Sequence, residues 1–161
     1  MNQMRIDRLI PLAFKILNEE KGEAEKIFHK TIDNEKKIKS VYKGYMSSIG
    51  PSIVQAGIIK SIASFSKQTK GGEGDRSVIC KLIKKLLLND GHYTQAEKDK
   101  DLLKILLNRL NNSTTTSLRI REEDRILEAI TAYKLVFDTY AKFDKKDRGA
   151  EWAIMHHIIS M

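Results

Sequence analysis

Apolar residues recur every three or four positions along almost the whole chain, which is the spacing of amphipathic helices. No segment sustains the strict alternation of apolar and polar residues that is typical of a half-buried strand. The first predicted helix covers residues 5–18, where Pro11 either kinks the helix or marks a later start. The second covers residues 31–48, with an apolar stripe that includes Ile38 and Tyr42.

Gly50 and Pro51 are expected to end the second helix and open a third, because proline at the first helical position loses no hydrogen bond. The third helix is predicted to run to about Lys67. Its apolar stripe consists of Val54, Ile58, Ile62 and Phe65. Glycine inside a helix costs roughly 1 kcal/mol relative to alanine, so Gly57 indicates a close approach by a neighbouring helix. The segment is therefore interpreted as a tight joint between two helices.

Three long helices are predicted in the second half of the chain. The fourth covers residues 76–88 and follows Asp75, a good N-cap residue. Thr94 and Glu97 have the spacing of a capping box, which places the start of the fifth helix there. The sixth covers residues 118–143, and a short terminal helix follows it after a charged break.

The chain contains no internal repeat and no proline-rich or serine-rich linker. Polar, glycine-containing segments such as "KQTKGGEGD" are expected to be surface loops. The sequence therefore predicts an all-α protein, folded as a single compact bundle of six to seven helices over residues 1–161. Residues 149–161 are expected to form an atypical C-terminal extension of this helical domain.

The composition is that of a soluble globular protein, with 41% hydrophobic and 31% charged residues in a chain of 161. Cys80 is the single cysteine, so no disulfide framework can form within the chain and a reducing compartment is expected. The apolar stretch near the N-terminus is too short for a membrane span and lacks the cleavage site of a signal peptide. We therefore expect a cytoplasmic protein without membrane contact.

The positive charge is unevenly distributed along the chain, whose formal net charge is +8. Residues 36–70 contain seven lysines and no acidic residue, whereas residues 71–161 contain sixteen basic and fourteen acidic residues. A surface of one sign suits contacts to the phosphates of a nucleic acid, which are strongly salt-dependent. No recognition-helix or RNA-module signature is present, so such binding is expected to be independent of base sequence. The alternative is a lysine-coated helix face that is merely solvated.

No combination of residues predicts catalysis or metal binding. His156 and His157 are adjacent and cannot share one face of a helix. Cys80 lies among apolar residues and is expected to be buried and unreactive. Carboxylates early in the sixth predicted helix would complement the positive end of the helix dipole. They are Glu122, Glu123, Asp124 and Glu128. We therefore expect no enzymatic activity, no metal and no cofactor.

Two segments carry a more specific pattern. "VYKGYMSSIGPSIVQAGIIKSIASF" combines paired tyrosines, a proline turn, a glycine followed by an apolar residue, and a closing phenylalanine. These features are Tyr42, Tyr45, Pro51, Gly57, Ile58 and Phe65. "REEDRILEAITAYKLVFDTYAKF" contains Glu128-Ala129, an aromatic at Tyr133 and the pair Lys142-Phe143. In this order the segments resemble the packing motifs of the Cmr small subunit family, the helical fifth subunit of type III-B CRISPR effector complexes.

The resemblance implies a non-catalytic, structural role in antiviral defence. Subunits of this family stack in two or three copies along the inner side of an RNA-guided effector complex, where they help to form the channel for the guide–target duplex. RNA cleavage belongs to the backbone subunits of that complex. The implied partners are guide RNA and target RNA through backbone contacts, the backbone and large subunits, and other copies of the chain.

In this interpretation, lysines flank the RNA backbone and reduce the repulsion between its strands. The predicted RNA-binding residues are Lys36, Lys39, Lys43, Lys60, Lys67, Lys81, Lys84, Lys85, Lys142, Lys145 and Lys146. Tyr42 and Tyr45 have rings that can stack on bases, but their place on an apolar stripe favours core packing. Two other functions stay open: a small helical subunit of a type III-A or type I effector, and a protein-only helical adaptor.

Overall fold

The structure is a computed structural model that describes residues 1–19, 21–67, 74–111 and 115–160. These residues form seven α-helices, two short 3₁₀ helices and a small three-stranded sheet, so the predicted all-α class is confirmed. In chain order the elements are α1 (Gln3–Leu17), η1 (Glu23–Ile27), β1 (Phe28–Lys30), β2 (Lys36–Lys39), α2 (Ser40–Ala56), α3 (Ile58–Ser66), α4 (Ser77–Asn89), η2 (Gln95–Glu97), α5 (Leu102–Asn111), α6 (Thr116–Phe137), β3 (Lys142–Phe143) and α7 (Lys145–Ser160).

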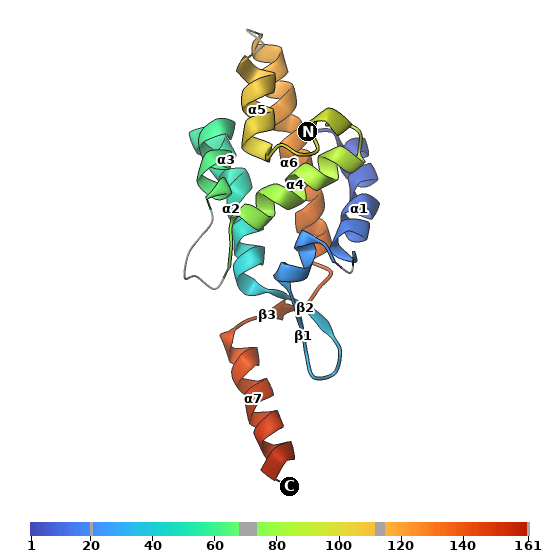
Figure 1. The fold of residues 1–161 in the computed structure, drawn as a ribbon, viewed down its shortest axis with the longest axis vertical. Coiled ribbons are helices and arrows are strands. Elements are labelled where there is room, and N and C mark those ends of the chain that lie inside the picture. The colour runs from blue at the N-terminus through green and yellow to red at the C-terminus, as the bar shows by residue number, and fades with distance from the viewer. Residues whose placement is uncertain (20, 68–73, 112–114, 161) are drawn as a thin grey trace.

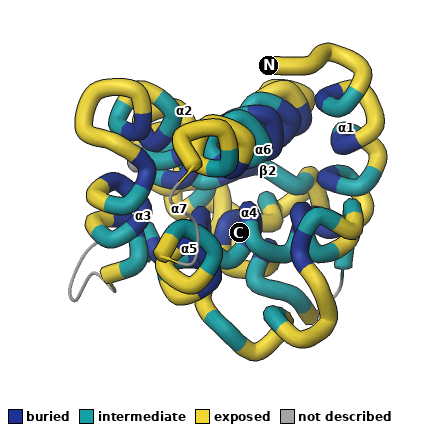
Figure 2. The backbone as a smooth tube through the Cα atoms, turned by 90° about the horizontal axis from the view of Figure 1, so that it is seen from above, coloured by how far each residue is buried: buried dark blue, intermediate teal, exposed yellow. Residues whose placement is uncertain are grey.

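Helix α6 is the element around which the others pack. It contacts α1, α2, α4 and α5, and the buried positions of these helices face one another (Figures 1 and 2). Ala129 and Ala132 are fully buried on α6, where their small side chains allow close packing of the neighbouring helices. Tyr133 is also fully buried, and its hydroxyl donates a hydrogen bond of 2.6 Å to the backbone oxygen of Leu82 in α4.

Both prolines lie inside helices. Pro11 lies within α1, and α2 continues through Gly50 and Pro51 to Ala56, so the predicted helix break at Gly50-Pro51 was wrong. Both proline rings are exposed, and the bend in the chain comes at Gly57 instead. Gly57 has φ 89° and ψ 158°, a backbone region that is essentially restricted to glycine. The joint between two helices that the sequence indicated therefore exists, but it lies six residues after Pro51.

Residues 31–39 were predicted to be helical, and this prediction was wrong. β1 pairs antiparallel with β2, and β2 pairs parallel with β3, with Ile38 opposite Lys142. Asn34 occupies the turn between β1 and β2 with φ 60°, a left-handed conformation that asparagine tolerates and that a right-handed helix excludes. Ile38 is buried, as its apolar character requires, but it lies in the sheet rather than on a helix stripe.

Two further boundaries differ from the prediction. α6 ends at Phe137, and the chain continues into β3 instead of remaining helical to residue 143. Val54 was assigned to the apolar stripe of the third helix, but it lies on the solvent side of α2 and is 71% exposed. The other members of that stripe are buried, as predicted; they are Ile58, Ile62 and Phe65.

The residues predicted as helix caps lie at helix starts, but at shifted positions. The N-cap of α4 is Arg76, and Asp75 precedes it. The Oδ1 atom of Asp75 accepts a hydrogen bond from the backbone nitrogen of Ser77, the first residue of α4. Thr94 and Glu97 form a capping box. This box caps the short η2 helix, however, and α5 begins only at Leu102.

The paired tyrosines of α2 pack in the core with the phenylalanine of α3. Tyr42 and Tyr45 meet edge to face, and Tyr45 meets Phe65 in the same way. The hydroxyl of Tyr42 accepts a hydrogen bond of 3.2 Å from the backbone nitrogen of Asp75, so it holds the start of α4 against α2. A Cβ atom at Gly74 would lie 2.8 Å from Cγ1 of Val41, which explains why glycine occupies that close approach.

Helix α7 extends away from the body of the molecule (Figure 1). Its base is fastened to β1, because the Nε2 atom of His29 lies 2.9 Å from Oε2 of Glu151. The ring of His29 also stacks on Phe143 of β3, with ring centres 3.7 Å apart. Among the described residues, no helix is both long enough and apolar enough to cross a membrane.

Replacing Gly57 by alanine should lower the free energy of unfolding by about 1–3 kcal/mol, because alanine is strained at this φ and ψ. No atom lies within 4 Å of the position of an added Cβ, so the loss would come from the backbone alone. Gly44→Ala is the matched control: Gly44 lies in α2, has a similarly empty neighbourhood, and should gain about 0.5–1 kcal/mol. Urea unfolding followed by circular dichroism measures the free energy of unfolding of both variants. Equal effects of the two substitutions would contradict the assignment of Gly57 as the helix break.

Candidate nucleic-acid interface

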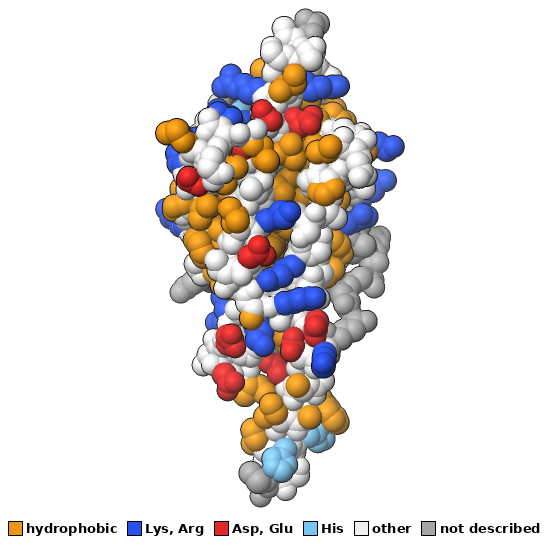
Figure 3. All heavy atoms as spheres, turned by 180° about the vertical axis from the view of Figure 1, so that it is seen from behind, with side chains coloured by type: hydrophobic (Ala, Val, Ile, Leu, Met, Phe, Trp, Pro, Cys, Tyr) orange, Lys and Arg blue, Asp and Glu red, His pale blue; other side chains and the backbone are white. Residues whose placement is uncertain are grey.

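The predicted RNA-binding lysines do not form one continuous patch. They are distributed over β2, α2, the α3 region, α4, β3 and α7. On the face opposite to that in Figure 1, Lys and Arg side chains form a band at mid-height, between a largely apolar area above and acidic side chains below (Figure 3). The lysines must therefore be considered individually, by what each ammonium group contacts.

Four of the predicted lysines donate hydrogen bonds to backbone oxygens of segments that are distant in sequence. The bonds run from Nζ of Lys36 to Leu17 (3.1 Å), of Lys39 to Lys26 (3.1 Å), of Lys43 to Tyr140 (2.7 Å), and of Lys84 to Lys98 (3.1 Å) and Lys100 (3.0 Å). Each bond ties two elements together, so these ammonium groups already have a structural role. An ammonium group has three donors and keeps its charge, so each can still contribute to the electrostatic field of the surface.

Two lysines of α4 are paired with carboxylates. Lys85 forms an ion pair with Glu19, and Nζ of Lys81 lies 3.8 Å from Oε2 of Glu23. Opposite charges at this distance partly cancel the local field. This edge of the molecule is therefore less attractive to a polyanion than the lysine count of α4 indicates.

Four predicted lysines have exposed side chains and no partner within the described part of the chain. They are Lys60, Lys67, Lys142 and Lys146. The side chain of Lys145 lies outside the described part. Lys60 lies in α3, where the neighbouring Ser61 is hydrogen-bonded to Ser52 in the second half of α2. α3 runs back along α2, and Phe65 packs on Tyr45, so Lys67 at the end of α3 lies toward the N-terminal half of α2. Lys142 lies in β3, which also contacts α2.

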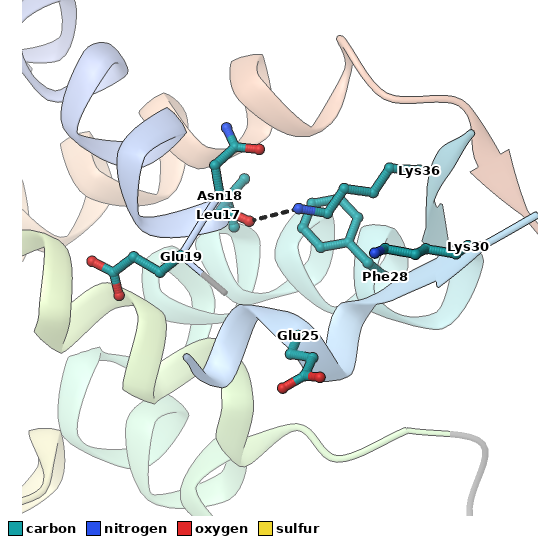
Figure 4. Close-up of a pocket in the computed structure, with 7 residues that line it drawn as sticks. All are labelled: Leu17, Asn18, Glu19, Glu25, Phe28, Lys30 and Lys36. Atoms are coloured by element: carbon teal, nitrogen blue, oxygen red, sulfur yellow. Dashed lines mark hydrogen bonds between the residues drawn. The ribbon is translucent and has the colours of Figure 1, made fainter. Parts of the chain in front are cut away.

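A surface hollow of about 660 Å³ lies between the end of α1, η1 and the hairpin (Figure 4). Its lining consists of Leu17, Asn18, Glu19, Glu25, Phe28, Lys30 and Lys36. The ammonium group of Lys36 points to the oxygen of Leu17 and lies 3.9 Å from the centre of the Phe28 ring. Burial, together with the nearby charge of Lys30, lowers the pKa of Lys36. Because its two lysines share the hollow with two carboxylates, the hollow is not a phosphate-binding site.

A buried polar network fastens α5 to α6. Glu122 is 1% exposed, and its carboxylate lies 3.0 Å from Nε2 of His92 and accepts a hydrogen bond of 2.9 Å from Arg109. Arg109 also donates two hydrogen bonds, of 2.8 and 2.7 Å, to Glu97. The ring of Tyr93 lies beneath this guanidinium, which is 4.8 Å from the ring centre.

The network changes the acidity of its members. The hydrogen bonds from Arg109 lower the pKa of Glu97 to about 2. Burial alone would raise the pKa of Glu122, but the interactions with His92 and Arg109 outweigh it and lower the pKa. Burial raises the pKa of Tyr93. Both carboxylates are therefore stabilised in their charged form, as expected for structural ion pairs.

A second buried carboxylate joins α1 to α6. Arg5 donates two hydrogen bonds of 2.8 Å to Glu128, which is fully buried and also accepts one from the backbone nitrogen of Asn2. The interpretation of the four carboxylates as first-turn groups facing the helix dipole was therefore wrong. α6 begins at Thr116 and has no acidic residue in its first turn; Glu122 and Glu128 lie farther along, on the inner side. Glu123 and Asp124 are partly exposed.

The residues that the sequence offered as candidates for chemistry lie on separate elements: Cys80 on α4, the carboxylates on α6 and the histidine pair on α7. Cys80 is buried, as predicted, and burial raises the pKa of its thiol to about 11, so it is a poor nucleophile at neutral pH. Within the described residues, no three His, Cys, Asp or Glu side chains are grouped so that they could hold a metal ion. His156 and His157 lie on the exposed part of α7.

Sequence reasoning missed the ion pairs that join the helices. Arg5 and Glu128 are 123 residues apart, and Glu97, Arg109 and Glu122 belong to three different elements. The only signal in the sequence was the occurrence of carboxylates on α6 among apolar residues at helical spacing. That spacing could have indicated that Glu122 and Glu128 face inward, but it could not have named their partners.

One family model matches the chain. The model described as "CRISPR-associated protein (Cas_Cmr5)" matches residues 19–140, which is about three quarters of the sequence. The match includes the whole segment with the tyrosine, proline and glycine pattern, and it includes Glu128-Ala129 and Tyr133 of the second segment. The pair Lys142-Phe143 lies just outside it. No curated protein and no solved structure matches the chain.

Lys84→Met should lower the free energy of unfolding by about 1 kcal/mol, because two backbone oxygens lose a charged donor while the aliphatic stem is kept. Lys104→Met is the matched control, since Lys104 is exposed and its ammonium group has no partner in the described ranges. Urea unfolding monitored by circular dichroism distinguishes the two. A loss of RNA affinity without a loss of stability in Lys84→Met would show that Lys84 serves the RNA rather than the fold.

The stability of the protein should fall as the pH decreases from about 4.5 to about 2. Glu97 has an ordinary pKa of 4.5 and a pKa of about 2 in the folded state, so its ion pair stabilises the protein above pH 4.5 and is lost as the pH approaches 2. Glu97→Gln should reduce the slope of the urea midpoint against pH in this range. Glu35→Gln, at an exposed position, should leave that slope unchanged, and a similar effect of both substitutions would contradict the assignment.

Proposed function

The chain belongs to the family of CRISPR-associated proteins described as Cas_Cmr5, and we propose that it is the non-catalytic small subunit of a type III-B CRISPR effector complex. The observation that carries the proposal is the family match over residues 19–140, which spans the chain from the end of α1 to the segment after α6. The proposed setting is antiviral defence in the cytoplasm. The protein would act as a helical domain that lines the channel for the guide and target RNA.

The proposed RNA contacts are electrostatic. Lys60, Lys67, Lys142 and Lys146 are the leading candidates among the eleven predicted lysines, because their side chains are exposed and have no partner among the described residues. A phosphate that binds one of them displaces only water and counterions, whereas a phosphate that binds a lysine held by a backbone oxygen competes with the fold. The remaining predicted lysines would strengthen the positive field without direct contact.

An apolar area on the molecule supports the proposed packing against other subunits. Large apolar side chains are exposed on α1, α2 and α6, and they are Met4 (81%), Val54 (71%), Ile120 (55%) and Leu135 (46%). Figure 3 shows apolar side chains gathered on the upper part of the face turned away in Figure 1. An apolar area on the surface favours a protein partner over RNA. We assign this face to the backbone subunits, the large subunit or neighbouring copies of the chain.

The proposal gives the chain no part in RNA cleavage. Glu122 and Glu128 are each engaged in an ion pair, and Cys80 is buried. A carboxylate that is held by a guanidinium and kept from solvent is poorly placed to move a proton on a bound substrate. The cleavage reaction would belong to other subunits of the complex.

Reversing the charge of the exposed lysines should weaken RNA binding. Lys60→Glu combined with Lys67→Glu should reduce the slope of log affinity against log salt by about 1–2, because each lost phosphate contact removes roughly 0.7–0.9. Lys98→Glu with Lys104→Glu is the matched control, with the same charge change at two exposed positions outside the predicted set. Fluorescence anisotropy with duplex RNA at 50–200 mM salt, roughly the range in which such contacts are screened, measures the slope.

An equal loss of slope in both variants would mean that net charge alone attracts RNA, and it would contradict the assigned contacts. Membership in the complex is tested separately by purifying a tagged chain from its native cells at moderate salt. Backbone and large subunits together with short repeat-derived RNA are the expected companions. A chain that purifies without RNA or effector subunits would favour the protein-only adaptor, and recovery of type III-A or type I subunits would reassign it to those complexes.

A further inference from the structure

The outer part of α7 is an apolar helix that the rest of the chain leaves uncovered. Five large apolar side chains on it are between 52% and 77% exposed. They are Trp152, Ile154, Met155, Ile158 and Ile159. Trp152, Met155 and Ile159 recur at spacings of three and four, with Ile154 and Ile158 beside them, so all five lie on one side of the helix. Exposed apolar groups in a single stripe indicate a surface that is covered by a partner.

The position of this stripe is defined by the fold and not by a loose tail. The pairing of His29 with Glu151 and the stacking of His29 on Phe143 hold the base of α7 against the sheet. Ile154 still lies near the hairpin, where it lines a shallow hollow together with Ile32. Beyond Ile154 the described residues of the helix are exposed, and α7 extends away from the body (Figure 1). α7 also lies outside the residues that match the family model.

The chemistry of the outer part of α7, residues 149–160, disfavours most kinds of partner. Residues 149–160 contain no lysine or arginine and a single carboxylate, Glu151, which is already paired with His29. A polyanion such as RNA therefore has nothing to bind there. Helices that bind membrane surfaces usually carry lysine and arginine on their polar side. The polar side of α7 carries Ala153, His156, His157 and Ser160 instead.

We propose that α7 pairs with the α7 helix of a second copy of this chain, side by side and antiparallel. The stripe is self-complementary, because a second uncharged apolar helix meets it without burying a charge. An antiparallel pair sets the basic first turn of each helix, with Lys146 and Arg148, near the negative C-terminal end of the other. A parallel pair would lack this complementarity.

The antiparallel arrangement also separates the charged bodies. Each copy carries a net charge of +8, and bodies placed side by side would repel one another. α7 has 16 residues and is therefore about 24 Å long, which exceeds the screening length of about 8 Å at physiological salt. In an antiparallel pair the two bodies lie at opposite ends of this length. The pairing thus buries the apolar stripe without bringing the two positively charged bodies close together.

The area available fits a weak, specific dimer. Ten large side chains from two copies, at roughly 100 Å² each, would remove on the order of 1,000 Å² from water, which is near the lower limit for a specific interface. We expect a dissociation constant of about 10 μM. The dimer should change little as salt is raised above the physiological level, because the charged bodies already lie farther apart than the screening length, whereas RNA binding should weaken. The pairing therefore does not depend on the proposed RNA function.

Sedimentation of the full chain without RNA, at concentrations from about 1 to 200 μM, tests the pairing. Ile158→Glu with Ile159→Glu should raise the dissociation constant by at least about tenfold. Leu107→Glu with Ala96→Glu is the matched control, because it adds the same two charges at exposed apolar residues outside α7 and outside the face assigned to other subunits. Circular dichroism of both variants verifies that the helices persist. The proposal would be overturned if the chain stayed monomeric at all concentrations, or if the control variant dissociated as much as the α7 variant. The apolar stripe would then be expected to bind another subunit or a membrane.

Single cysteines distinguish the two directions of pairing. Met155 lies near the centre of the stripe, so Met155→Cys should form a disulfide with its own copy in an antiparallel pair. Ile159→Cys should not, because the two copies of residue 159 would be about 10 Å apart. Cys80 is buried and does not compete. Efficient crosslinking at both positions would indicate a parallel pair and overturn the antiparallel arrangement.

Discussion

Helix α6 is surrounded by α1, α2, α4 and α5, and the burial of its inner side is the constraint on which the other elements depend. A fully buried tyrosine hydroxyl needs a partner, and Tyr133 finds it in the backbone oxygen of Leu82. This hydrogen bond helps to fix the position of α4 along α6. The alanines beside Tyr133 allow the close packing, and the edge-to-face contacts of Tyr42, Tyr45 and Phe65 continue the core to α3.

The same helix carries two carboxylates into the interior. A buried charge is tolerated only when it is paired and hydrogen-bonded, and Glu122 and Glu128 are paired with Arg109 and Arg5. Such pairs add little net stability compared with apolar residues, but they accept only one arrangement of the helices. They therefore specify how α5 and α1 lie on α6, while the apolar contacts supply most of the stabilisation.

The positive charge of the protein serves two different purposes. Lysines at the joints of the fold, such as Lys36, Lys43 and Lys84, donate hydrogen bonds to backbone oxygens of distant segments. Lysines on the outside, such as Lys60 and Lys142, are exposed and make no such hydrogen bond to the described part of the chain. Neither the net charge of the chain nor the spacing of its lysines distinguishes the structural lysines from the exposed ones. Only the position of each ammonium group relative to a carbonyl separates a structural lysine from a candidate RNA contact.

The sequence by itself determined the helical class, the family and the buried, unreactive state of Cys80, because periodicity and short motifs depend on local residues. It misplaced the bend at Pro51 and the helix over residues 31–39, because the backbone angles of Gly57 and Asn34 are selected by packing and by the pairing of β2 with β3. Only the tertiary structure decided which carboxylates and lysines are paired, since their partners lie up to 123 residues away. Pairing is a property of distance in space, and spacing along a chain does not encode it.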